Sequence, residues 1–493
     1  MRGHVAGKPD DAASFAALKT VLRSRPAVMH LALVTVGLIL LIGWAVKPWQ
    51  WSLVDDPDYR LGLLKAQQED GWLGGILERV NVAYTYDRIG GQFRPFLWVY
   101  SATFYLLEPG LAHALRLLLL LVAVGSVGLA VRQRLVGVVE PVLTWMVLLW
   151  AMAAVASVRG LYDGLAFLSI MELPTVTFVA VAIADRNPAR RVLWLSLASL
   201  CKTPVVGGLF AVAVVLYRDA RRGLALTALL AGVVIVLWAR DFALGGSYTA
   251  NYALTLASAQ STLVGLGRQL GLPVLVLASA LLWVRSRPRV SADAFIVGSA
   301  GFGYVVLLLP WGSSSGYNLA TPAFLLVFCA VLVLTATLRA LWSERAASTV
   351  GAPARRSART LRLRLPLLVA VLVAGFVATI GVKAAFDRDS TIRGVVRWAG
   401  SLPPGDVVAT NGVESSVRYP QLLDLRHGDR PSPSFVYAEP GSALPCSVRW
   451  VVAMNDQGPL TLETPLALVL SLPMGDIYRV EHSSGQDPRC GPQ

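Results

Sequence analysis

Long apolar segments that alternate with short basic clusters fill residues 28–383 of this chain. An α-helix rises about 1.5 Å per residue, so about 20 apolar residues cross the roughly 30 Å hydrocarbon core of a bilayer. The pattern predicts an all-α polytopic membrane domain with about eleven transmembrane helices. The segments expected to cross are 28–46, 110–131, 138–158, 164–184, a broken pair within 192–217, 223–239, 269–284, 293–310, 321–338 and 365–383.

Basic residues predict the orientation of these helices, because Lys and Arg concentrate in cytoplasmic loops. Three basic residues lie between positions 19 and 25, directly before the first apolar segment, so residues 1–27 are expected in the cytoplasm. The first crossing then leads to a long outer loop, 47–109. Counting on to the last crossing places residues 384–493 outside as well.

The apolar run 192–217 has basic clusters at both ends, although a single crossing would separate the two sides of the membrane. A hairpin of two short helices that turns at Leu200-Cys201-Lys202-Thr203-Pro204 resolves this conflict. Proline disfavours the helical conformation of the residue before it, and broken helices are tolerated within a membrane where they line protein or a wet cavity. We therefore expect a turn at membrane depth that carries Lys202.

Within the outer loop, apolar residues recur at near-helical spacing between Leu61 and Val80 and alternate with charged residues. This pattern predicts one or two helices that lie on the outer membrane surface. A second polar loop outside the membrane is expected at 240–268. Tryptophans expected to anchor the first loop at the interface are at positions 49, 51, 72 and 98.

From position 384 the sequence becomes polar and rich in proline and glycine. Short apolar runs separated by turn residues predict strands, and one helix is expected at 390–399. The sequence thus predicts a small C-terminal α/β domain outside the membrane. The expected strands are 406–410, 448–454, 466–472 and 477–480.

Composition supports the membrane interpretation and changes the meaning of the net charge. Of the 493 residues, 55% are hydrophobic and only 15% are charged, and the mean hydropathy is +0.58, outside the range of ordinary soluble domains. A net charge of +14 would suggest nucleic acid as the partner of a soluble protein. Here the arginines fall into clusters between apolar runs, so we interpret them as a topology signal and expect no nucleic-acid binding.

Four cysteines are present. Cys201 and Cys329 lie in apolar runs, where a thiol usually acts as a small packing residue. Cys446 and Cys490 share the polar C-terminal region and could form a disulfide if that region faces an oxidising compartment, so the sequence leaves this pairing open. The spacing contains no CxxC motif and no histidine cluster, so a structural zinc site is not expected.

An acidic stretch, Val54-Asp55-Asp56-Pro57-Asp58-Tyr59-Arg60, follows the first apolar segment. Carboxylates at the edge of a bilayer are costly, which favours a chemical role in a cavity there. An alternative is that Asp56 is the N-cap of a helix, with Pro57 at its first position and Asp58 favoured by the helix dipole. The two interpretations are compatible, since Asp56 can cap a helix while Asp55 faces a substrate.

Three motifs together resemble the GT-C class of membrane glycosyltransferases and are similar to bacterial protein-mannosyltransferase and aminoarabinose-transferase enzymes. They are Asp55-Asp56-Pro57-Asp58-Tyr59, Gly90-Gly91-Gln92-Phe93-Arg94-Pro95-Phe96, and Leu197-Ala198-Ser199-Leu200-Cys201-Lys202-Thr203-Pro204. The resemblance extends to the overall architecture, including a C-terminal domain outside the membrane.

The resemblance implies a sugar donor carried on polyprenyl phosphate at the outer face of the cytoplasmic (inner) membrane, and an envelope glycan or protein as acceptor. Asp55 matches the leading aspartate of the class, which assists attack by the acceptor, and Lys202 matches a lysine at the hairpin turn. This chain departs from the class in placing Pro57 directly after the acidic pair. Which of Asp55 and Asp56 is the base therefore stays open.

The chemistry of such a transfer agrees with the residues present. A base must take the proton of the acceptor hydroxyl, and positive charge must receive the departing phosphate. A strong acid is not needed, in contrast to glycosidases, so one acidic cluster with cations suits an inverting single displacement. Asp55 is the predicted base, and Lys202, Arg94 and Arg159 are the predicted phosphate-binding cations. Arg94 could instead anchor at lipid headgroups.

Further substrate contacts are expected from residues near the predicted outer side, namely Glu172, Tyr59, Trp311, Tyr317 and Asn318. Glu172 lies in an apolar run and could pair with Lys202. Asp55, Asp56 and Glu172 are also suitable oxygen ligands for a divalent cation such as magnesium or manganese. No spacing rule ties the three carboxylates together, so the sequence requires no cofactor and leaves a divalent cation open.

Three other functions fit the same pattern. A polysaccharide polymerase or ligase of the envelope would share the lipid substrate but would depend on outer-loop arginines more than on an aspartate. A flippase or transporter of lipid-linked sugars would move substrate without forming a bond. A scaffold that displays the C-terminal domain would be indifferent to Asp55→Ala.

Overall fold

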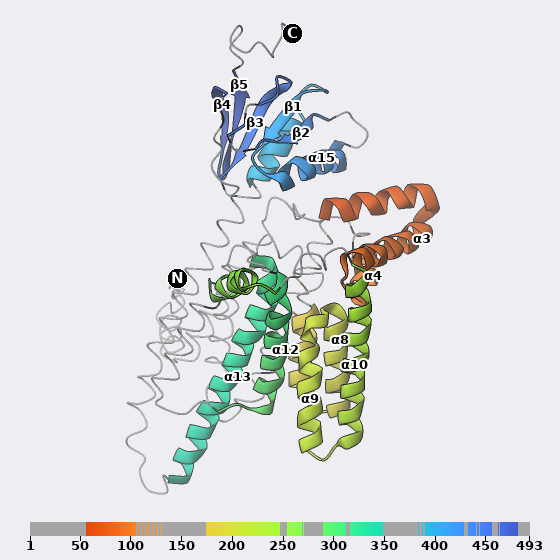
Figure 1. Ribbon diagram of the computed structural model, residues 1–493, viewed down its shortest axis with the longest axis vertical. Coiled ribbons are helices and arrows are strands. Elements are labelled where there is room, and N and C mark those ends of the chain that lie inside the picture. The colour runs from red at the N-terminus through yellow and green to blue at the C-terminus, as the bar shows by residue number, and fades with distance from the viewer. Residues whose placement is uncertain are drawn as a thin grey trace, which may run out of the picture.

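A computed structural model of the chain describes residues 56–104, 174–246, 254–268, 289–311, 316–348, 390–427, 432–455 and 462–481, apart from a few single positions. The described part is rich in helix and ends in a small mixed sheet (Figure 1). Two of its helices are long and apolar enough to cross a membrane, Arg222–Gly245 and Leu319–Thr337. Shorter apolar helices are Pro174–Ala184, Thr203–Arg218 and Ala292–Leu308.

The predicted crossings 28–46 and 138–158 lie outside the described residues, 110–131, 269–284 and 365–383 are described only at isolated positions, and 164–184 is described only from residue 174. The figure of about eleven crossings therefore stays a prediction. The labelled helices before the sheet are α3 (Asp56–Gly90), α4 (Pro95–Phe104), α8 (Pro188–Cys201), η1 (Thr203–Val206), α9 (Gly207–Arg218), α10 (Arg222–Gly245), α12 (Ala292–Leu308), η3 (Leu309–Trp311) and α13 (Gly316–Ser348). Residues 174–184, 256–268 and 390–399 are helical as well.

The predicted broken pair is present as α8, η1 and α9. Asn187 caps α8, since its side-chain oxygen accepts hydrogen bonds from the backbone N–H groups of Ala189 (3.0 Å) and Arg190 (3.4 Å). Lys202 leaves the helical conformation (φ −143°, ψ 99°) and ends α8, and Pro204 lies in the short helix η1 that follows. Helices α8 and α9 then pack against each other as a hairpin. Their close approach is seen at Gly208, where a methyl group would lie 3.4 Å from Leu195 Cδ2.

Helices α9, α12 and α13 pack side by side around a continuous apolar core, and α10 covers α9 and α8 (Figure 1). Glycines let the backbones of α12 and α13 approach: a methyl group at Gly301 would lie 3.1 Å from Leu325 Cβ. α10 keeps an apolar outer face, with Leu230, Val234 and Leu237 more than half exposed. An exposed apolar face of this size is typical of a surface that contacts lipid or another protein.

The outer loop contains the two predicted helices as the halves of α3, which turn back on each other at Gly71 (φ 74°, ψ 178°). This positive φ favours glycine. Gly62 lies beside Arg79, so the halves form an antiparallel hairpin (Figure 1). Asp56 and Asp87 therefore lie at the same end of it, because they are 15 and 16 residues from the bend at Gly71. Two segments contain more helix than the sequence analysis described: residues 95–104 form α4 within the predicted loop 47–109, and in the predicted loop 240–268 α10 continues to Gly245 and residues 256–268 form a helix.

The C-terminal sheet has the strand order β2-β1-β3-β5-β4. β1 is parallel to both of its neighbours, and β3, β5 and β4 pair antiparallel. Helix 390–399 and α15 (Val413–His427) share one apolar cluster on one face of the sheet. The strands are β1 (Val407–Thr410), β2 (Ser434–Tyr437), β3 (Val448–Met454), β4 (Leu466–Leu472) and β5 (Gly475–Val480).

All four predicted strands and the helix at 390–399 are therefore present, and the sequence interpretation missed β2 and α15. Cys446 is disulfide-bonded, whereas Cys201 and Cys329 are not. The predicted partner of Cys446, Cys490, lies outside the described residues.

Candidate functional site

The turn that carries Lys202 meets the outer loop at its glycine-rich corner. Thr203 Oγ1 donates a hydrogen bond of 2.7 Å to the carbonyl oxygen of Phe93, 110 residues away in the chain. Lys202, half-buried, and Arg94 are the sequence neighbours of these two residues. Two of the three predicted phosphate-binding cations thus belong to segments that are in direct contact.

The corner at Gly90-Gly91-Gln92-Phe93 is fixed against the outer end of α10. Gly91 has φ +72°, and a methyl group there would lie 3.3 Å from the Cα atoms of Ala243 and Gly246. The backbone N–H of Gln92 donates to the carbonyl oxygen of Asp87 (2.8 Å) and closes the last turn of α3. Glycine is therefore required at position 91 both for the positive φ and for the close approach.

A buried carboxylate holds Arg94. The Asp87 side chain is 1% exposed and forms an ion pair with Arg94, whose Nε donates to Oδ1 at 3.0 Å while its Nη2 donates to the same oxygen. The indole N–H of Trp98 donates to Oδ2 at 2.7 Å. Such paired and hydrogen-bonded charges can stay buried, whereas a lone buried charge could not.

Aromatic rings surround this ion pair and close the space between the outer loop and α10. Phe93 contacts Phe242 (5.3 Å between ring centroids) and Trp238 (5.8 Å), and Tyr84 lies edge-on to Trp98 at 5.1 Å. Trp238 and Tyr84 remain 57% and 41% exposed. The site therefore offers ring faces beside cationic side chains, a combination suited to sugar or phosphate ligands.

A second ion pair ties α3 to α10 at the surface. Arg88 Nη1 donates to Asp241 Oδ2 at 2.6 Å, and the guanidinium lies 4.9 Å from the centre of the Phe242 ring. The hydrogen bond from Arg88 to Asp241 raises the pKa of this guanidinium, so Arg88 stays charged. Both side chains are well exposed, and we assign this pair a minor structural role.

The position of the turn along the bundle follows from α12, which runs in the same direction as α8. Arg191, in the first turn of α8, forms an ion pair of 3.2 Å with Asp293 at the start of α12. Further along, a methyl group at Gly303 would lie 3.4 Å from the carbonyl oxygen of Pro204. The helical path from Arg191 to Lys202 rises about 17 Å, so the Lys202 turn is separated by that length of helix from the ion pair of Arg191 with Asp293.

The structure describes the other predicted site residues only in part. Asp56 starts α3 at the end of the hairpin that also holds Asp87, but its side chain lies outside the described part. The side chains of Tyr59, Trp311, Tyr317 and Asn318 are likewise outside it, and so are Asp55, Arg159 and Glu172 altogether.

The sequence interpretation missed Asp87 and Thr203, and it placed Trp98 at the membrane surface as an anchor. In the structure Trp98 is half-buried and hydrogen-bonded to Asp87. The sequence did hold a signal for the ion pair, because Asp87 and Arg94 flank the turn-forming pair Gly90-Gly91. Arg94 already has this partner, so its guanidinium cannot serve a phosphate without sharing Asp87.

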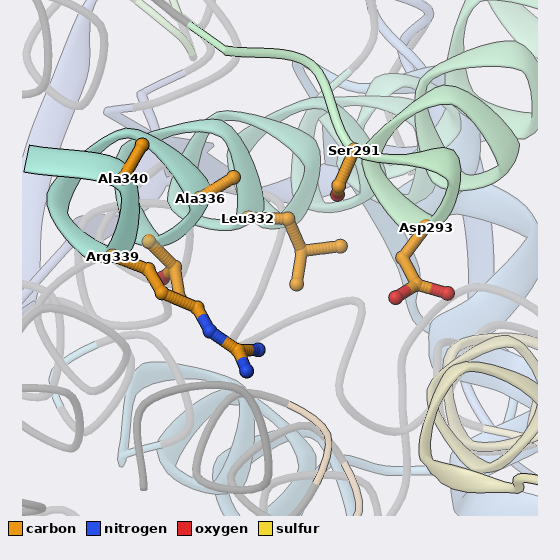
Figure 2. A pocket seen from close by; sticks show the side chains of 7 residues that line it. Ser291, Asp293, Leu332, Ala336, Arg339 and Ala340 are labelled. Carbon is orange, nitrogen blue, oxygen red and sulfur yellow. The ribbon is translucent and has the colours of Figure 1, made fainter. Parts of the chain in front are cut away.

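At the opposite end of the bundle, a cavity of about 360 Å³ lies between the start of α12 and the part of α13 from Leu332 to Ala340 (Figure 2). It is far from the contact between Thr203 and Phe93, because it lies at the end of α12 that Arg191 contacts. Its residues played no part in the predicted site.

Within the described ranges, no group of three or more His, Cys, Asp or Glu side chains could hold a metal ion. Two of the three predicted ligands, Asp55 and Glu172, lie outside those ranges, so the metal prediction remains open. A scan against family models, a search of curated proteins and a search of solved structures each found no match to this chain.

Proposed function

We propose that this chain is an integral membrane glycosyltransferase that transfers a sugar from a polyprenyl-phosphate donor to an envelope glycan or protein at the outer face of the cytoplasmic membrane. The observation that carries the proposal is the hydrogen bond between Thr203 and Phe93. It joins the turn with Lys202 to the loop with Arg94, as a shared phosphate site requires. A lysine at membrane depth is itself an indication of function.

In this mechanism a carboxylate of the acidic stretch, Asp55 or Asp56, takes the proton of the acceptor hydroxyl. The hydroxyl oxygen attacks the sugar carbon from the face opposite the phosphate, so the configuration inverts. Lys202 stabilises the negative charge that develops on the departing phosphate. Asp87 acts as a positioning residue, because it fixes the direction of the Arg94 guanidinium.

The polymerase or ligase alternative depends on outer-loop arginines. Both arginines of the corner in the described part, Arg88 and Arg94, are ion-paired with aspartates. An arginine-centred mechanism would therefore have to use guanidinium groups that already neutralise Asp241 and Asp87. A flippase is distinguished by experiment, since it forms no glycosidic bond.

The test is a transfer assay with purified protein, radiolabelled polyprenyl-phosphate sugars and cell-envelope acceptors. Loss of the base is expected to reduce transfer at least about 100-fold in Asp55→Asn or Asp56→Asn. Lys202→Gln is expected to reduce it about 100- to 1,000-fold. Lys65→Gln is the matched control, because Lys65 lies on the same outer loop with its side chain 76% exposed.

The proposal fails if all three site variants transfer sugar at the wild-type rate while remaining folded. Movement of labelled lipid between leaflets without product formation would favour the flippase instead. Location is tested separately through Cys446, since a disulfide indicates an oxidising compartment. Non-reducing alkylation of whole cells followed by peptide mass spectrometry should recover Cys446 in a disulfide-linked peptide.

A further inference from the structure

A short helix at residues 256–268, called the surface helix below, lies within the segment that the sequence analysis treated as a polar loop. Figure 1 shows it as the short green helix without a label that runs across the direction of α12. Its start is capped reciprocally: Thr255 Oγ1 accepts from the backbone N–H of Ser258 (3.0 Å), and Ser258 Oγ accepts from that of Thr255 (3.1 Å). The local sequence therefore specifies where this helix begins.

One side of the surface helix is fixed to the last turn of α12. Thr262 is completely buried, and its Oγ1 donates a hydrogen bond of 3.1 Å to the carbonyl oxygen of Leu308. Leu266, one helical turn further on, is 8% exposed and belongs to the apolar core that α12 and α13 share. Positions 262 and 266 lie on the same face of the helix, so this face is its attachment to the bundle.

Another side of the surface helix is apolar and exposed. Leu256, Leu263 and Val264 expose 86%, 54% and 46% of their surface. Leu256 and Leu263 are seven residues apart, so they lie on one face of the helix. Arg268, in the last turn, is the one charged residue among positions 256–268. An exposed apolar face on a helix with so little charge is typical of a surface covered by lipid or by protein.

The contact between α3 and α10 shows where the apolar length of the bundle ends. In α10, residues 223–239 include no charged residue and rise about 25 Å, close to the roughly 30 Å of a bilayer core. Arg240 and Asp241 follow directly, and Asp241 pairs with Arg88 of α3 at 2.6 Å. α3 therefore joins α10 at the level where its apolar stretch gives way to charged residues.

The surface helix joins the bundle at the same end. Leu308 is the last residue of α12, about 22 Å along the helix from Asp293 near its start. Gly303, a little earlier in α12, lies beside Pro204 of the Lys202 turn, which in turn contacts Phe93 of the outer loop. Both α3 and the surface helix are thus attached at the end of the bundle near the Lys202 turn.

α3 also exposes apolar side chains at this end. Leu73 and Leu77 are each 62% exposed and Tyr84 is 41% exposed, and their spacing of four and seven residues puts them on one face. The ring of Tyr84 lies 5.8 Å from that of Phe242 in α10, close to the exposed Trp238. Figure 1 shows α3 beside α10 and the surface helix beside α12 and α13, on different sides of the bundle.

We propose that the exposed side of the surface helix is inserted into one leaflet of the membrane, at the boundary between lipid headgroups and acyl chains. Leu256, Leu263 and Val264 contact acyl carbons, and Arg268 lies among the headgroups. A bilayer surrounds the bundle and therefore reaches both apolar surfaces, whereas a protein partner or a second copy would have to reach two sides of it. The inference rests on the membrane location in the proposed function and not on sugar transfer.

The experiment attaches a bimane label to Leu256→Cys and, separately, to Leu263→Cys, with the full chain in phosphatidylcholine nanodiscs. Discs with and without brominated acyl chains are compared, because bromine quenches only a label that it contacts. Both labels are expected to lose about half of their fluorescence or more in the brominated discs. Unmutated protein, treated in the same way, gives the background from Cys201 and Cys329.

Leu468→Cys is the matched control, because Leu468 is a leucine of similar exposure (59%) on β4 of the C-terminal sheet. Its label is expected to lose less than about one tenth of its fluorescence, since no lipid reaches it. Leu256 is 86% exposed, so its replacement removes no core contact, and the melting temperature of each variant shows that it is folded.

Two outcomes overturn the inference. Quenching no greater than that of Leu468→Cys, with the emission of a label in water, would show that the surface helix is solvated. Emission typical of an apolar environment without quenching by bromine would show that protein covers it, and disulfide cross-links between two Leu256→Cys copies would identify that protein. A chain that transfers sugar while its label is unquenched refutes this inference alone, and a quenched label without transfer refutes only the proposed activity.

Discussion

At the end of the bundle near the Lys202 turn, the carboxylate of Asp87 is almost completely buried and has two donors, Arg94 and Trp98. At the opposite end Asp185 and Asp293 keep 12% and 17% of their side chains exposed and pair with arginines. The charges of Asp87 and Arg94 therefore depend on each other for solvation, whereas those of Asp185 and Asp293 are also solvated by water. A buried ion pair such as Asp87 with Arg94 fixes the positions of its two side chains. The more exposed pairs of Asp185 and Asp293 with arginines constrain their side chains less.

The largest expected loss of stability is that of the variant Asp87→Ala. Asp87→Ala leaves the Arg94 guanidinium buried without its carboxylate, and we expect the free energy of unfolding to fall by about 3–5 kcal/mol. Thermal unfolding in detergent measures this loss. A loss under about 1 kcal/mol would mean that the pair is solvated like those of Asp185 and Asp293.

The double variant Asp87→Leu with Arg94→Met sharpens the result. Removing both charges is expected to restore most of the stability, leaving about 1–3 kcal/mol for the unpaired indole N–H of Trp98. If stability returns but sugar transfer does not, Arg94 has a role beyond neutralising Asp87.

A smaller effect is expected where the hairpin turn meets the outer loop. Thr203→Val keeps the shape of the side chain but leaves the carbonyl of Phe93 without its donor, which costs about 1–2 kcal/mol of unfolding free energy. Thr227→Val is the control, since Thr227 is exposed and bonds only within α10. Chemical denaturation should separate the two variants; equal midpoints would contradict the prediction.

Asp241→Asn tests an exposed pair at the end near the Lys202 turn. Arg88 and Asp241 are 41% and 68% exposed, so we expect this variant to lose less than about 1 kcal/mol, and less still at high salt. The measurement is the unfolding midpoint at two salt concentrations. A loss as large as that of Asp87→Ala would break the distinction between buried and exposed pairs.

The smallest effect is the pH dependence of the opposite end. The backbone N–H of Asn187 lowers the pKa of Asp185, assisted by the Trp194 indole and by Arg190. The ionised carboxylate therefore stabilises the fold above its ordinary pKa of about 3.9, and this contribution is lost as the pH falls through the lowered value.

Melting temperatures between pH 6 and pH 3 measure that contribution. Wild type should lose about 1 °C more than Asp185→Asn over this range, because the amide does not titrate. Identical pH dependence of the two proteins would show that Asp185 contributes nothing to acid sensitivity.

Several helices and strands could be predicted from short-range sequence patterns alone. Pro204 and the flanking arginines predicted the turn at Lys202, and apolar runs predicted α10, α13 and four strands. β2 was missed because it is a four-residue edge strand without a clear alternation of buried positions. α15 was missed because it contains Pro420 and many polar residues.

The sequence by itself determined where the chain must be apolar, where helices break and where basic residues gather, because these depend on neighbours within a few positions. Only the tertiary structure decided that Asp87 holds Arg94, that Thr203 reaches Phe93, and that Arg339 and Asp293 share a cavity. Such contacts depend on how helices pack across long chain separations, and the spacing of residues along the chain carries little information about that packing.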